Sequence, residues 1–280
     1  MSDHRQESRA HWAESAKGWE AHAEELRRFT LPVSSWMVDA IQPQPGDTLL
    51  ELAAGPGETG FLAAEMIRPG GTLISSDLVP EMLMIAQRRA EELKLDNVRF
   101  KQIDAETSID IEAASIDGVL CRWGYMLMAE PGNALRETRR VLKPGGRLAL
   151  AAWAGPDDNP WSALTGRELV RRGLVERPDP DAPGQFAWAK EGVIAEQLAQ
   201  AGFVDFEVDS VGFEQVYRDF EDFWRTQSEL SGQMRRGLAA AGPEETEALK
   251  ADIREQVDVF TRGDGAIVMP ARTWVAVAEA

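Results

Sequence analysis

One short stretch, ELAAGPGETG at 51–60, most constrains what this chain can fold into. Gly55, Gly57 and Gly60 directly follow the apolar run TLLELAA, in the G-x-G-x-x-G spacing of a strand, a tight loop and a helix. Glycines let a backbone approach a ligand closely. In an open parallel sheet, the ligand lies beyond the carboxyl ends of the strands. The stretch therefore predicts an α/β fold with a ligand site at this loop.

The segments around this loop alternate in the same rhythm. Apolar runs predict strands at 48–54, 72–78, 98–104, 115–123 and 147–153. Helices are expected at about 60–66, at 80–94 after Pro80, and at 132–142, where KPGG ends the last of them. Strands that alternate with helices at this spacing indicate a parallel sheet with helices on both faces.

The remaining segments are expected to extend a single domain over 1–280 rather than to form a second one. An amphipathic helix at 8–30 predicts an N-terminal cover. A helix at 191–202, a strand at 203–211 and a final strand at 271–280 complete a core of about 30–153, 191–211 and 268–280. Two insertions remain, an irregular one at 154–190 and a mostly helical one at 212–262; loops of this length are often lids or binding elements.

Three acidic residues at predicted strand ends indicate which ligand the loop holds. Glu51, four residues before the first glycine, would repel a pyrophosphate and attract a cation or an amino group. Asp77 can accept hydrogen bonds from two ribose hydroxyls. Asp104 can reach the amino group of adenine. Together they suit S-adenosylmethionine, which has a sulfonium cation and no phosphate. A nicotinamide-dependent oxidoreductase stays open as an alternative, although no Tyr-x-x-x-Lys pair is recognisable.

The chain resembles class I S-adenosylmethionine-dependent methyltransferases, in particular the small-molecule group that includes ubiquinone and menaquinone biosynthesis methyltransferases. Five stretches in order carry the resemblance: LLELAAGPGETG, LISSDLVPEML, QIDAE, IDGVLCRWGYMLM and RETRRVLKPGGRLALAAW. It covers residues 10–153 well and the later segments more loosely. The resemblance implies a Rossmann-like, seven-stranded, mostly parallel sheet whose last strand is antiparallel, with S-adenosylmethionine as cofactor and S-adenosylhomocysteine as product.

The resemblance also implies a role for each matching residue. Gly55 and Gly57 would line the methionine portion, beside Ala53, which stands where Cys or Gly is frequent. Glu51 would orient the ligand or the loop, and Asp77 would take the ribose hydroxyls. The residues expected around the adenine are Leu78, Met82, Ala105, and Asp104 or Glu106. Cys121 and Arg122 would border the sulfonium and the carboxylate. Trp19, with Trp12, matches aromatic residues that often lie over the cofactor, although spacing by seven also marks a core stripe.

No catalytic base is evident from the sequence. Tyr125, just beyond the fourth strand, and His22, on the N-terminal helix, are the candidates considered for orienting or deprotonating a substrate. Aromatic residues in or beside the insertions, among them Trp153 and Trp224, either wall an apolar acceptor pocket or form the insertions' own core. We therefore expect methyl transfer to oxygen or carbon of a small aromatic or apolar molecule. A non-catalytic S-adenosylmethionine-binding protein is the second alternative.

Composition narrows the partners. The formal net charge of −17 and the lack of a basic run disfavour nucleic acid. No apolar stretch approaches the ~20 residues of a membrane span, and the polar N-terminus has no signal-peptide core. Cys121 is the only cysteine, so we expect no multi-cysteine metal site. A single cysteine also agrees with a protein of the reducing cytoplasm. The expected partner is a small-molecule acceptor, with homodimer formation left open.

Overall fold

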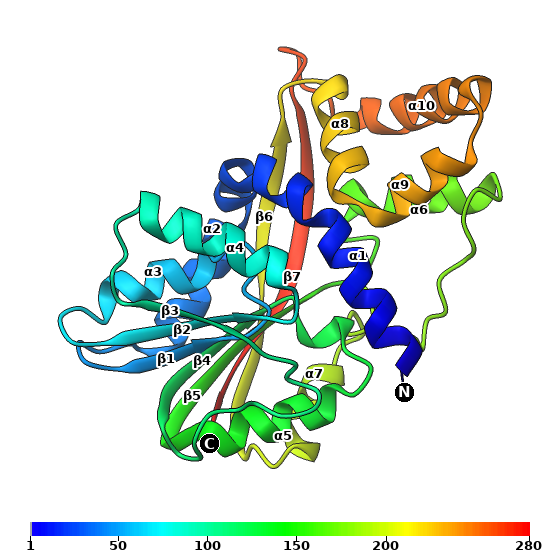
Figure 1. Cartoon of the computed structure of the whole chain (residues 1–280). Helices are drawn as coiled ribbons and strands as arrows, with labels where there is room; N and C mark the ends of the chain where they lie inside the picture. Colours follow the sequence, from blue (N-terminus) through cyan, green and yellow to red (C-terminus); the bar gives the residue numbers. More distant parts are fainter. Residues whose placement is uncertain (1) are drawn as a thin grey trace.

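The computed structural model describes residues 2–280, and within them a single seven-stranded sheet has the order β3-β2-β1-β4-β5-β7-β6 (Figure 1). The strands are β1 (Thr48–Glu51), β2 (Thr72–Asp77), β3 (Val98–Gln102), β4 (Ile116–Arg122), β5 (Leu142–Trp153), β6 (Asp205–Tyr217) and β7 (Ile267–Glu279). The first five strands pair in parallel, and β7 runs antiparallel to both β5 and β6. The expected mostly parallel sheet with an antiparallel last strand is confirmed.

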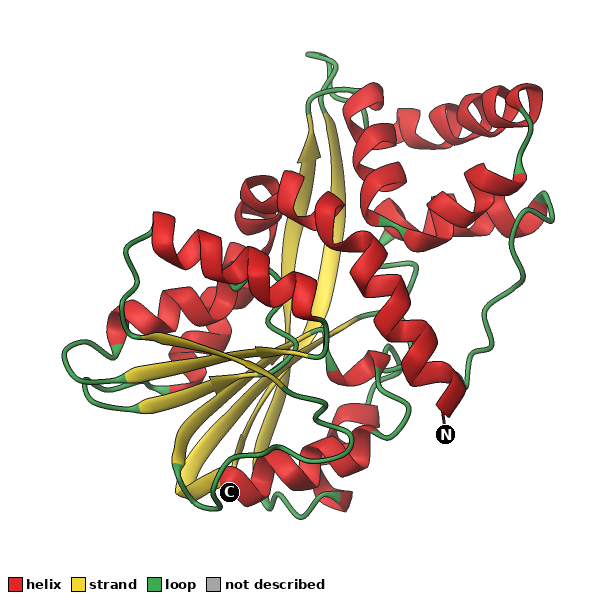
Figure 2. Cartoon of the chain, in the orientation of Figure 1, coloured by secondary structure: helices red, strands yellow, loops and turns green. Residues whose placement is uncertain are grey.

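Helices cover both faces of this sheet (Figure 2). They are α1 (Ser2–Ala21), α2 (Ala23–Ile41), α3 (Glu58–Met66), α4 (Pro80–Glu92), α5 (Pro131–Val141), α6 (Pro160–Arg171), α7 (Val193–Gln200), α8 (Phe220–Leu230), α9 (Gly232–Ala240) and α10 (Pro243–Val257). Short 3-10 turns span Tyr125–Leu127 and Asp258–Phe260. In Figure 1, α2, α3 and α4 lie on one face of the sheet, and α5 and α7 lie on the other.

Proline begins four of these helices, because a proline at the first helical position loses no intrahelical hydrogen bond. The rule explains why the predicted start at Pro80 agrees with α4. Helix α2 departs from the rule, since it continues through Pro32 to Ile41, where a helix ending near residue 30 was expected. Val33, Met37 and Val38 on its far half are fully buried, so the burial of this apolar face outweighs the helix-breaking effect of the proline.

The two inserted segments contain more regular structure than expected. Helix α6 occupies part of the 154–190 segment that the sequence predicted to be irregular, and β6 continues to Tyr217 instead of ending at 211. Residues 212–217 of β6 pair with the first residues of β7 beyond the end of β5, so these two strands form a ribbon that projects from the sheet (Figure 1).

Helices α6, α8, α9 and α10 pack on this ribbon around a small core of their own. The buried members of that core are Leu169, Tyr217, Phe223, Met234, Leu249, Ile253, Val257, Ile267 and Met269. Residues from both insertions, Leu169 of α6 and Phe223 of α8 among them, therefore share one apolar cluster. We call this part of the molecule the helical unit.

Candidate functional site

The loop between β1 and α3 is shaped by residues with positive φ. Ala53, Gly55 and Gly57 have φ of 51°, 53° and 90°, and this conformation favours glycine. A Cβ added at Gly55 would meet no atom within 4 Å, so open space lies beside that backbone. A Cβ at Gly57 would overlap the ring of Phe61. Gly55 therefore faces space that a ligand can occupy, whereas Gly57 allows close packing inside the loop.

The third glycine of the motif admits the side chain of Glu51. Oε1 of Glu51 accepts a hydrogen bond from the amide of Gly60 at 2.8 Å, and a Cβ at Gly60 would overlap Oε2. Within residues 2–280, nothing hydrogen-bonds to Oε2, although this atom is buried. Burial raises the pKa of Glu51 to about 8. A cation placed near Oε2 would favour ionisation and supply the missing partner.

Asp77, at the end of β2, holds the loop from the neighbouring strand. Its Oδ2 accepts from the amide of Gly55 and its Oδ1 from the amide of Val79, each at 2.9 Å. Burial raises the pKa of this carboxyl, and the two amides oppose the shift. Each carboxylate oxygen can accept a second hydrogen bond. The side chain thus supports the loop and still has acceptor capacity for ribose hydroxyls.

Helix α1 covers the region that was expected to flank the adenine. Met82 of α4 belongs to a buried cluster that Trp12, Trp19 and Leu78 contact. The rings of Trp12 and Trp19 pack edge to face, with centroids 5.7 Å apart. The structure therefore brings Trp19, Leu78 and Met82 together. Their packing agrees equally with a core stripe and with a wall beside a ligand, the two alternatives that the sequence left open.

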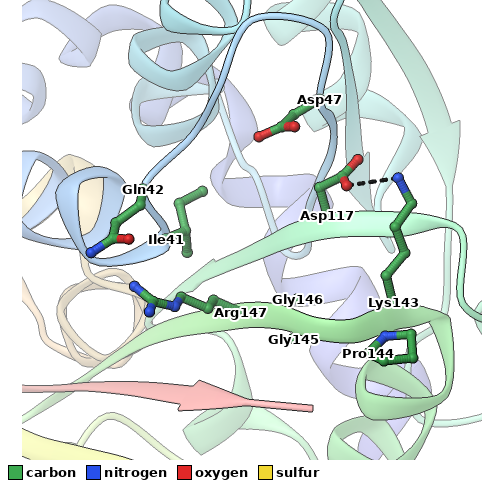
Figure 3. Close-up of a pocket in the computed structure, with 9 residues that line it drawn as sticks. All are labelled: Ile41, Gln42, Asp47, Asp117, Lys143, Pro144, Gly145, Gly146 and Arg147. Atoms are coloured by element: carbon green, nitrogen blue, oxygen red, sulfur yellow. Dashed lines mark hydrogen bonds and ion pairs between the residues drawn. The ribbon is translucent and has the colours of Figure 1, made fainter.

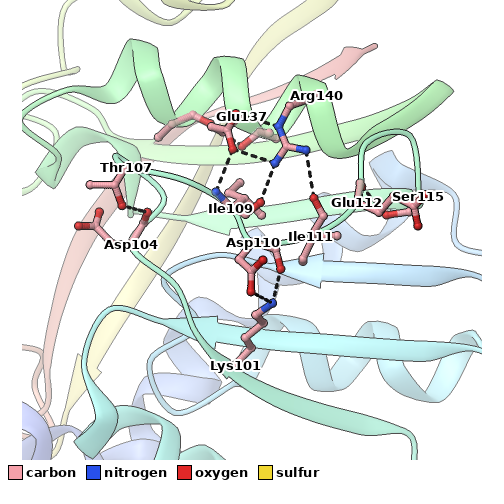
Figure 4. Close-up of polar contacts among 12 residues, drawn as sticks. Lys101, Asp104, Thr107, Ile109, Asp110, Ile111, Glu112, Ser115, Glu137 and Arg140 are labelled. Carbon is pink, nitrogen blue, oxygen red and sulfur yellow. Dashed lines mark hydrogen bonds and ion pairs between the residues drawn. The ribbon is translucent and has the colours of Figure 1, made fainter.

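The segment after β3 is fixed by its own turn and by α5 (Figure 4). Asp104 accepts from the amide of Glu106 at 3.1 Å, and its other oxygen lies 3.4 Å from Arg5 of α1. Ala105 is buried, and Glu106 accepts from the amide of Glu130 at 2.7 Å. Further along the segment, Arg140 of α5 donates to two main-chain carbonyls, those of Ile109 and Ile111. Asp104 and Glu106 thus also serve local turn chemistry.

The end of β4 approaches the same loop. A Cβ at Gly124 would lie 2.7 Å from Sγ of Cys121 and 2.8 Å from Cβ of Ala53, so the turn after β4 touches the loop after β1. Cys121 is fully buried, and burial raises the pKa of its thiol to about 12. The thiol therefore stays protonated near neutral pH, which fits a small packing residue and no nucleophilic role.

Arg122 is held by the start of α3. Its Nε donates to Oγ1 of Thr59 at 2.9 Å, and its Nη2 lies 3.6 Å from Oε2 of Glu58. The guanidinium carbon is 4.5 Å from the ring centroid of Trp123. Its Nη1 is buried and, among the described residues, has no hydrogen-bond partner. Nη1 of Arg122 is thus available to donate to an anionic group or a carbonyl of a ligand.

The residues considered for the substrate lie in three different places. Tyr125 is buried, and its hydroxyl bonds to Oγ1 of Thr138 at 2.7 Å, so it packs in the core instead of reaching a substrate. Trp224 packs on Phe220 in the helical unit. Trp153, the last residue of β5, is stacked on Trp123 at 4.0 Å between ring centroids, and both rings are mostly buried.

His22 does not lie free at the site either. It is buried at the junction of α1 and α2, where Nδ1 lies 2.5 Å from Glu25 and Nε2 lies 2.6 Å from Glu229 of α8. With both ring nitrogens engaged by carboxylates, the imidazole connects the N-terminal helices to the helical unit. This contact gives His22 a structural role in place of the expected role as a base.

Sequence reasoning missed Trp123. It follows Arg122 directly, has φ of 59°, and donates from Nε1 to Oγ1 of Thr273 at 2.9 Å. Its ring lies between Arg122 and Trp153, and Trp161 packs edge-on against Trp153 at 5.0 Å. The signal was present in the letters CRWG at a predicted strand end, where a large aromatic residue next to an arginine favours a cation–π contact.

A separate polar pocket lies at the opposite edge of the sheet (Figure 3). It encloses about 300 Å³ between the end of α2 and the beginnings of β1, β4 and β5. Lys143 and Asp117 at its rim pair with each other at 2.6 Å. Because ligands of open parallel sheets bind beyond the carboxyl ends of the strands, this pocket is distinct from the glycine-loop site.

Comparison with known proteins identifies the class. A methyltransferase-domain family model matches residues 43–169. The chain is 34% identical over 186 residues to a demethylmenaquinone methyltransferase of Clavibacter sepedonicus, covering 60% of this chain and 70% of that protein. It is 28% identical over 189 residues to the nocamycin O-methyltransferase of Saccharothrix syringae, covering 63% and 66%. Against three other curated relatives it spans 51%, 27% and 53% of the relative's length.

Solved structures share this fold. The crystal structure of the YcgJ protein from Bacillus subtilis superimposes with a TM-score of 0.59 at 19% identity, over 88% of this chain and 97% of that one.

A parallel sheet with a glycine loop and carboxylates at its strand ends defines an α/β nucleoside-binding fold. The chain belongs to the class I S-adenosylmethionine-dependent methyltransferases. S-Adenosylmethionine is accordingly the cofactor of the family to which this site belongs.

The residues present fit that cofactor. Among the buried polar atoms that have no hydrogen bond in the described chain, Oε2 of Glu51 and Nη1 of Arg122 belong to strand-end residues next to the glycine loop. They have the charges that an ammonium or sulfonium and a carboxylate require. None of the helices in the described part of the chain has the length and apolarity of a bilayer span. Over the same residues, three or more His, Cys, Asp or Glu side chains do not converge in a metal-binding arrangement.

Proposed function

We propose that this chain transfers a methyl group from S-adenosylmethionine to oxygen or carbon of a small aromatic or apolar acceptor. The observation that carries the proposal is that Glu51 and Arg122, the last residues of β1 and β4 beside the glycine loop, each have a buried polar atom without a hydrogen bond in the described chain. Their opposite charges match the ammonium and the carboxylate that the amino-acid portion of the ligand carries on a single carbon. Asp77, whose oxygens keep acceptor capacity, would take the ribose hydroxyls.

In this proposal, the residues of the chain orient the cofactor and the acceptor and exclude water from the site. The sulfonium methyl of the bound cofactor is itself an electrophile, so an oriented nucleophile is the main requirement. Proximity and orientation can lower a barrier by roughly 7–11 kcal/mol in favourable cases. Cys121 remains protonated and Tyr125 is used in the core, so neither is assigned as a base. The α1 helix, with Trp12 and Trp19, would cover the adenine side and exclude water.

The acceptor would lie on the aromatic side of the site. Trp123, Trp153 and Trp161 form a continuous aromatic wall next to Arg122, and Phe213 of β6 lies 6.0 Å from Trp153 between ring centroids. Flat rings favour apolar or aromatic ligands. The names of two relatives refer to small molecules, demethylmenaquinone and nocamycin, which agrees with this class. The charge of −17 disfavours a nucleic-acid acceptor.

Two measurements test the proposal. Calorimetry with S-adenosylhomocysteine and with NADH should show binding of the first alone; binding of NADH alone would contradict it. Transfer of a labelled methyl group would then be followed across a panel of quinols, phenols and carboxylic acids. Binding of S-adenosylhomocysteine without transfer to any member would favour the second candidate, a non-catalytic binding protein. That candidate is kept because no catalytic base is found among the residues lining the loop.

A further inference from the structure

A buried group of charges lies behind the glycine loop, between α3, α4 and β4. Glu58, the first residue of α3, is 4% exposed. Its Oε1 lies 3.2 Å from Nη2 of Arg89 on α4, and its Oε2 lies 3.6 Å from Nη2 of Arg122. We call Arg89, Glu58 and Arg122 the Glu58 cluster. Its carboxylate is shared by two guanidinium groups that belong to separate elements.

Each residue of the cluster has a buried atom without a hydrogen bond in the described chain: both carboxylate oxygens of Glu58, Nε of Arg89 and Nη1 of Arg122. Arg122 uses Nε on Thr59 and Nη2 on Glu58, and keeps a buried Nη1 for which the rest of the described chain offers no hydrogen bond. A buried donor without an acceptor is destabilising until a ligand supplies the acceptor. The position of this donor is set by the two neighbouring residues that begin α3, which lie directly after the glycine loop. Arg122 is therefore held against the first residues of α3 with one of its donors still available.

The second guanidinium decides the charge of the cluster. Arg122 and Glu58 alone would sum to zero, so they would attract an anion only weakly. Arg89, with a side chain 12% exposed, brings the sum to +1. Its other acidic neighbour, Glu24, is 3.7 Å away and 75% exposed, so solvent screens it. The N-terminus of α3 adds a partial positive charge at the same place. Glu51 also interacts with Arg122, but in the proposed complex its negative charge is offset by the ammonium of the ligand.

We propose that Arg89 is a positioning residue for cofactor binding: through Glu58 it fixes Arg122 and leaves the cluster with the positive charge that holds the carboxylate end of the ligand. This inference rests on the proposed function, since it assumes S-adenosylmethionine at the glycine loop. Arg89 itself does not touch the ligand. Its effect, through Glu58 and Arg122, is confined to the amino-acid portion of the ligand, and a comparison of ligands with and without that portion can detect it.

The test compares two ligands by calorimetry. S-Adenosylhomocysteine carries the amino-acid end, whereas 5′-methylthioadenosine has the same adenosine and a thioether but lacks that end. In Arg89→Met, we expect affinity for S-adenosylhomocysteine to fall at least tenfold while affinity for 5′-methylthioadenosine stays within twofold of wild type. Arg88→Met is the matched control, because Arg88 is adjacent, half exposed and paired with Glu20 at the surface. It should leave both affinities unchanged.

Arg89→Lys keeps the charge without the planar fork, so its effect should be smaller and still confined to S-adenosylhomocysteine. It also decides the matter if Arg89→Met does not fold. Equal losses for both ligands, or a folded variant with wild-type affinity for S-adenosylhomocysteine, would overturn the positioning role. A wild-type protein that binds neither ligand would instead refute the proposed function, so the two failures are distinguishable.

Discussion

The carboxylate of Glu51 lies against the backbone of Gly60, with 2.8 Å between Oε1 and the amide nitrogen. The two residues are the first and last of the stretch ELAAGPGETG, and the last glycine is there because any side chain would displace the carboxylate. This pairing connects β1 to α3. It also directs Oε2 into the position where a cation would be bound.

Gly60→Ala should disturb cofactor binding more than it disturbs the fold. The added methyl overlaps Oε2 of Glu51, so the carboxylate must move and its hydrogen bond is lost. We expect stability to fall by about 1–3 kcal/mol, as for a buried overpacked site, and binding of S-adenosylhomocysteine to weaken in calorimetry. Gly132→Ala in α5, where a new Cβ meets only the flexible end of Arg136, is the control and should be neutral. Unchanged binding in Gly60→Ala would show that Glu51 does not need this position.

Ionisation of Glu51 should make stability depend on pH. Its pKa is about 8 in the folded chain against 4.5 for the free group, so the folded state retains a proton that the unfolded state has lost. Stability therefore falls as pH rises from about 4.5 to about 8, by at most roughly 1.4 kcal/mol per pH unit. Urea unfolding at several pH values should show this slope in the wild type relative to Glu51→Gln. Parallel curves for the two proteins would contradict the raised pKa.

Removal of the Asp77 side chain should weaken cofactor binding for two reasons. Asp77→Ala deletes the acceptor proposed for the ribose hydroxyls and also frees the amides of Gly55 and Val79. Lost charge-assisted hydrogen bonds suggest about 1–3 kcal/mol of binding free energy. Isothermal titration with S-adenosylhomocysteine measures the change. Asp110→Ala is a suitable comparison, because Asp110 is exposed and pairs only with Lys101 among its described neighbours; it should bind like wild type.

Two tryptophans should separate acceptor binding from folding. Trp153→Ala removes part of the aromatic wall beside Trp123, so we expect a higher KM for an aromatic acceptor. Trp224→Ala removes a ring that packs on Phe220 inside the helical unit, and should lower Tm with KM unchanged. Steady-state kinetics with the best acceptor of the panel, together with thermal unfolding, would show both effects. A raised KM in Trp224→Ala and not in Trp153→Ala would place the acceptor elsewhere.

The sequence predicted the sheet well because its strands are apolar runs separated by glycine and proline signals. Strands 72–78 and 98–104 agree with β2 and β3 to within two residues at either end. The same reasoning missed α6, because the Pro- and Asp-rich letters around 154–190 outweighed its helical pattern. It also predicted one helix over 8–30, whereas α1 ends at Ala21 and α2 continues to Ile41. The burial of α2 on the sheet is a tertiary effect that the local sequence does not contain.

For the candidate site, the sequence predicted that Glu51, Asp77 and Asp104 lie at or just after strand ends. It did not predict that Arg89 lies near them. In the sequence it is half of an Arg-Arg pair on an amphipathic helix, and such pairs usually face solvent. Its partner Glu58 lies on another helix, and only the packing of α3 against α4 brings the two together. Tyr125 illustrates the opposite error, because proximity to a strand end did not reveal that its hydroxyl bonds to Thr138.

The ribbon of β6 and β7 has a consequence for how such a chain changes over time. Tyr217, the last residue of β6, pairs directly with Ile267, the first residue of β7. The segment that carries α8, α9 and α10 therefore begins and ends at one pair of neighbouring residues. Insertions whose two ends already touch are the ones a fold tolerates best. The segment between these two residues can therefore differ in length and content without a change in the strand pairing that positions the glycine loop and its carboxylates.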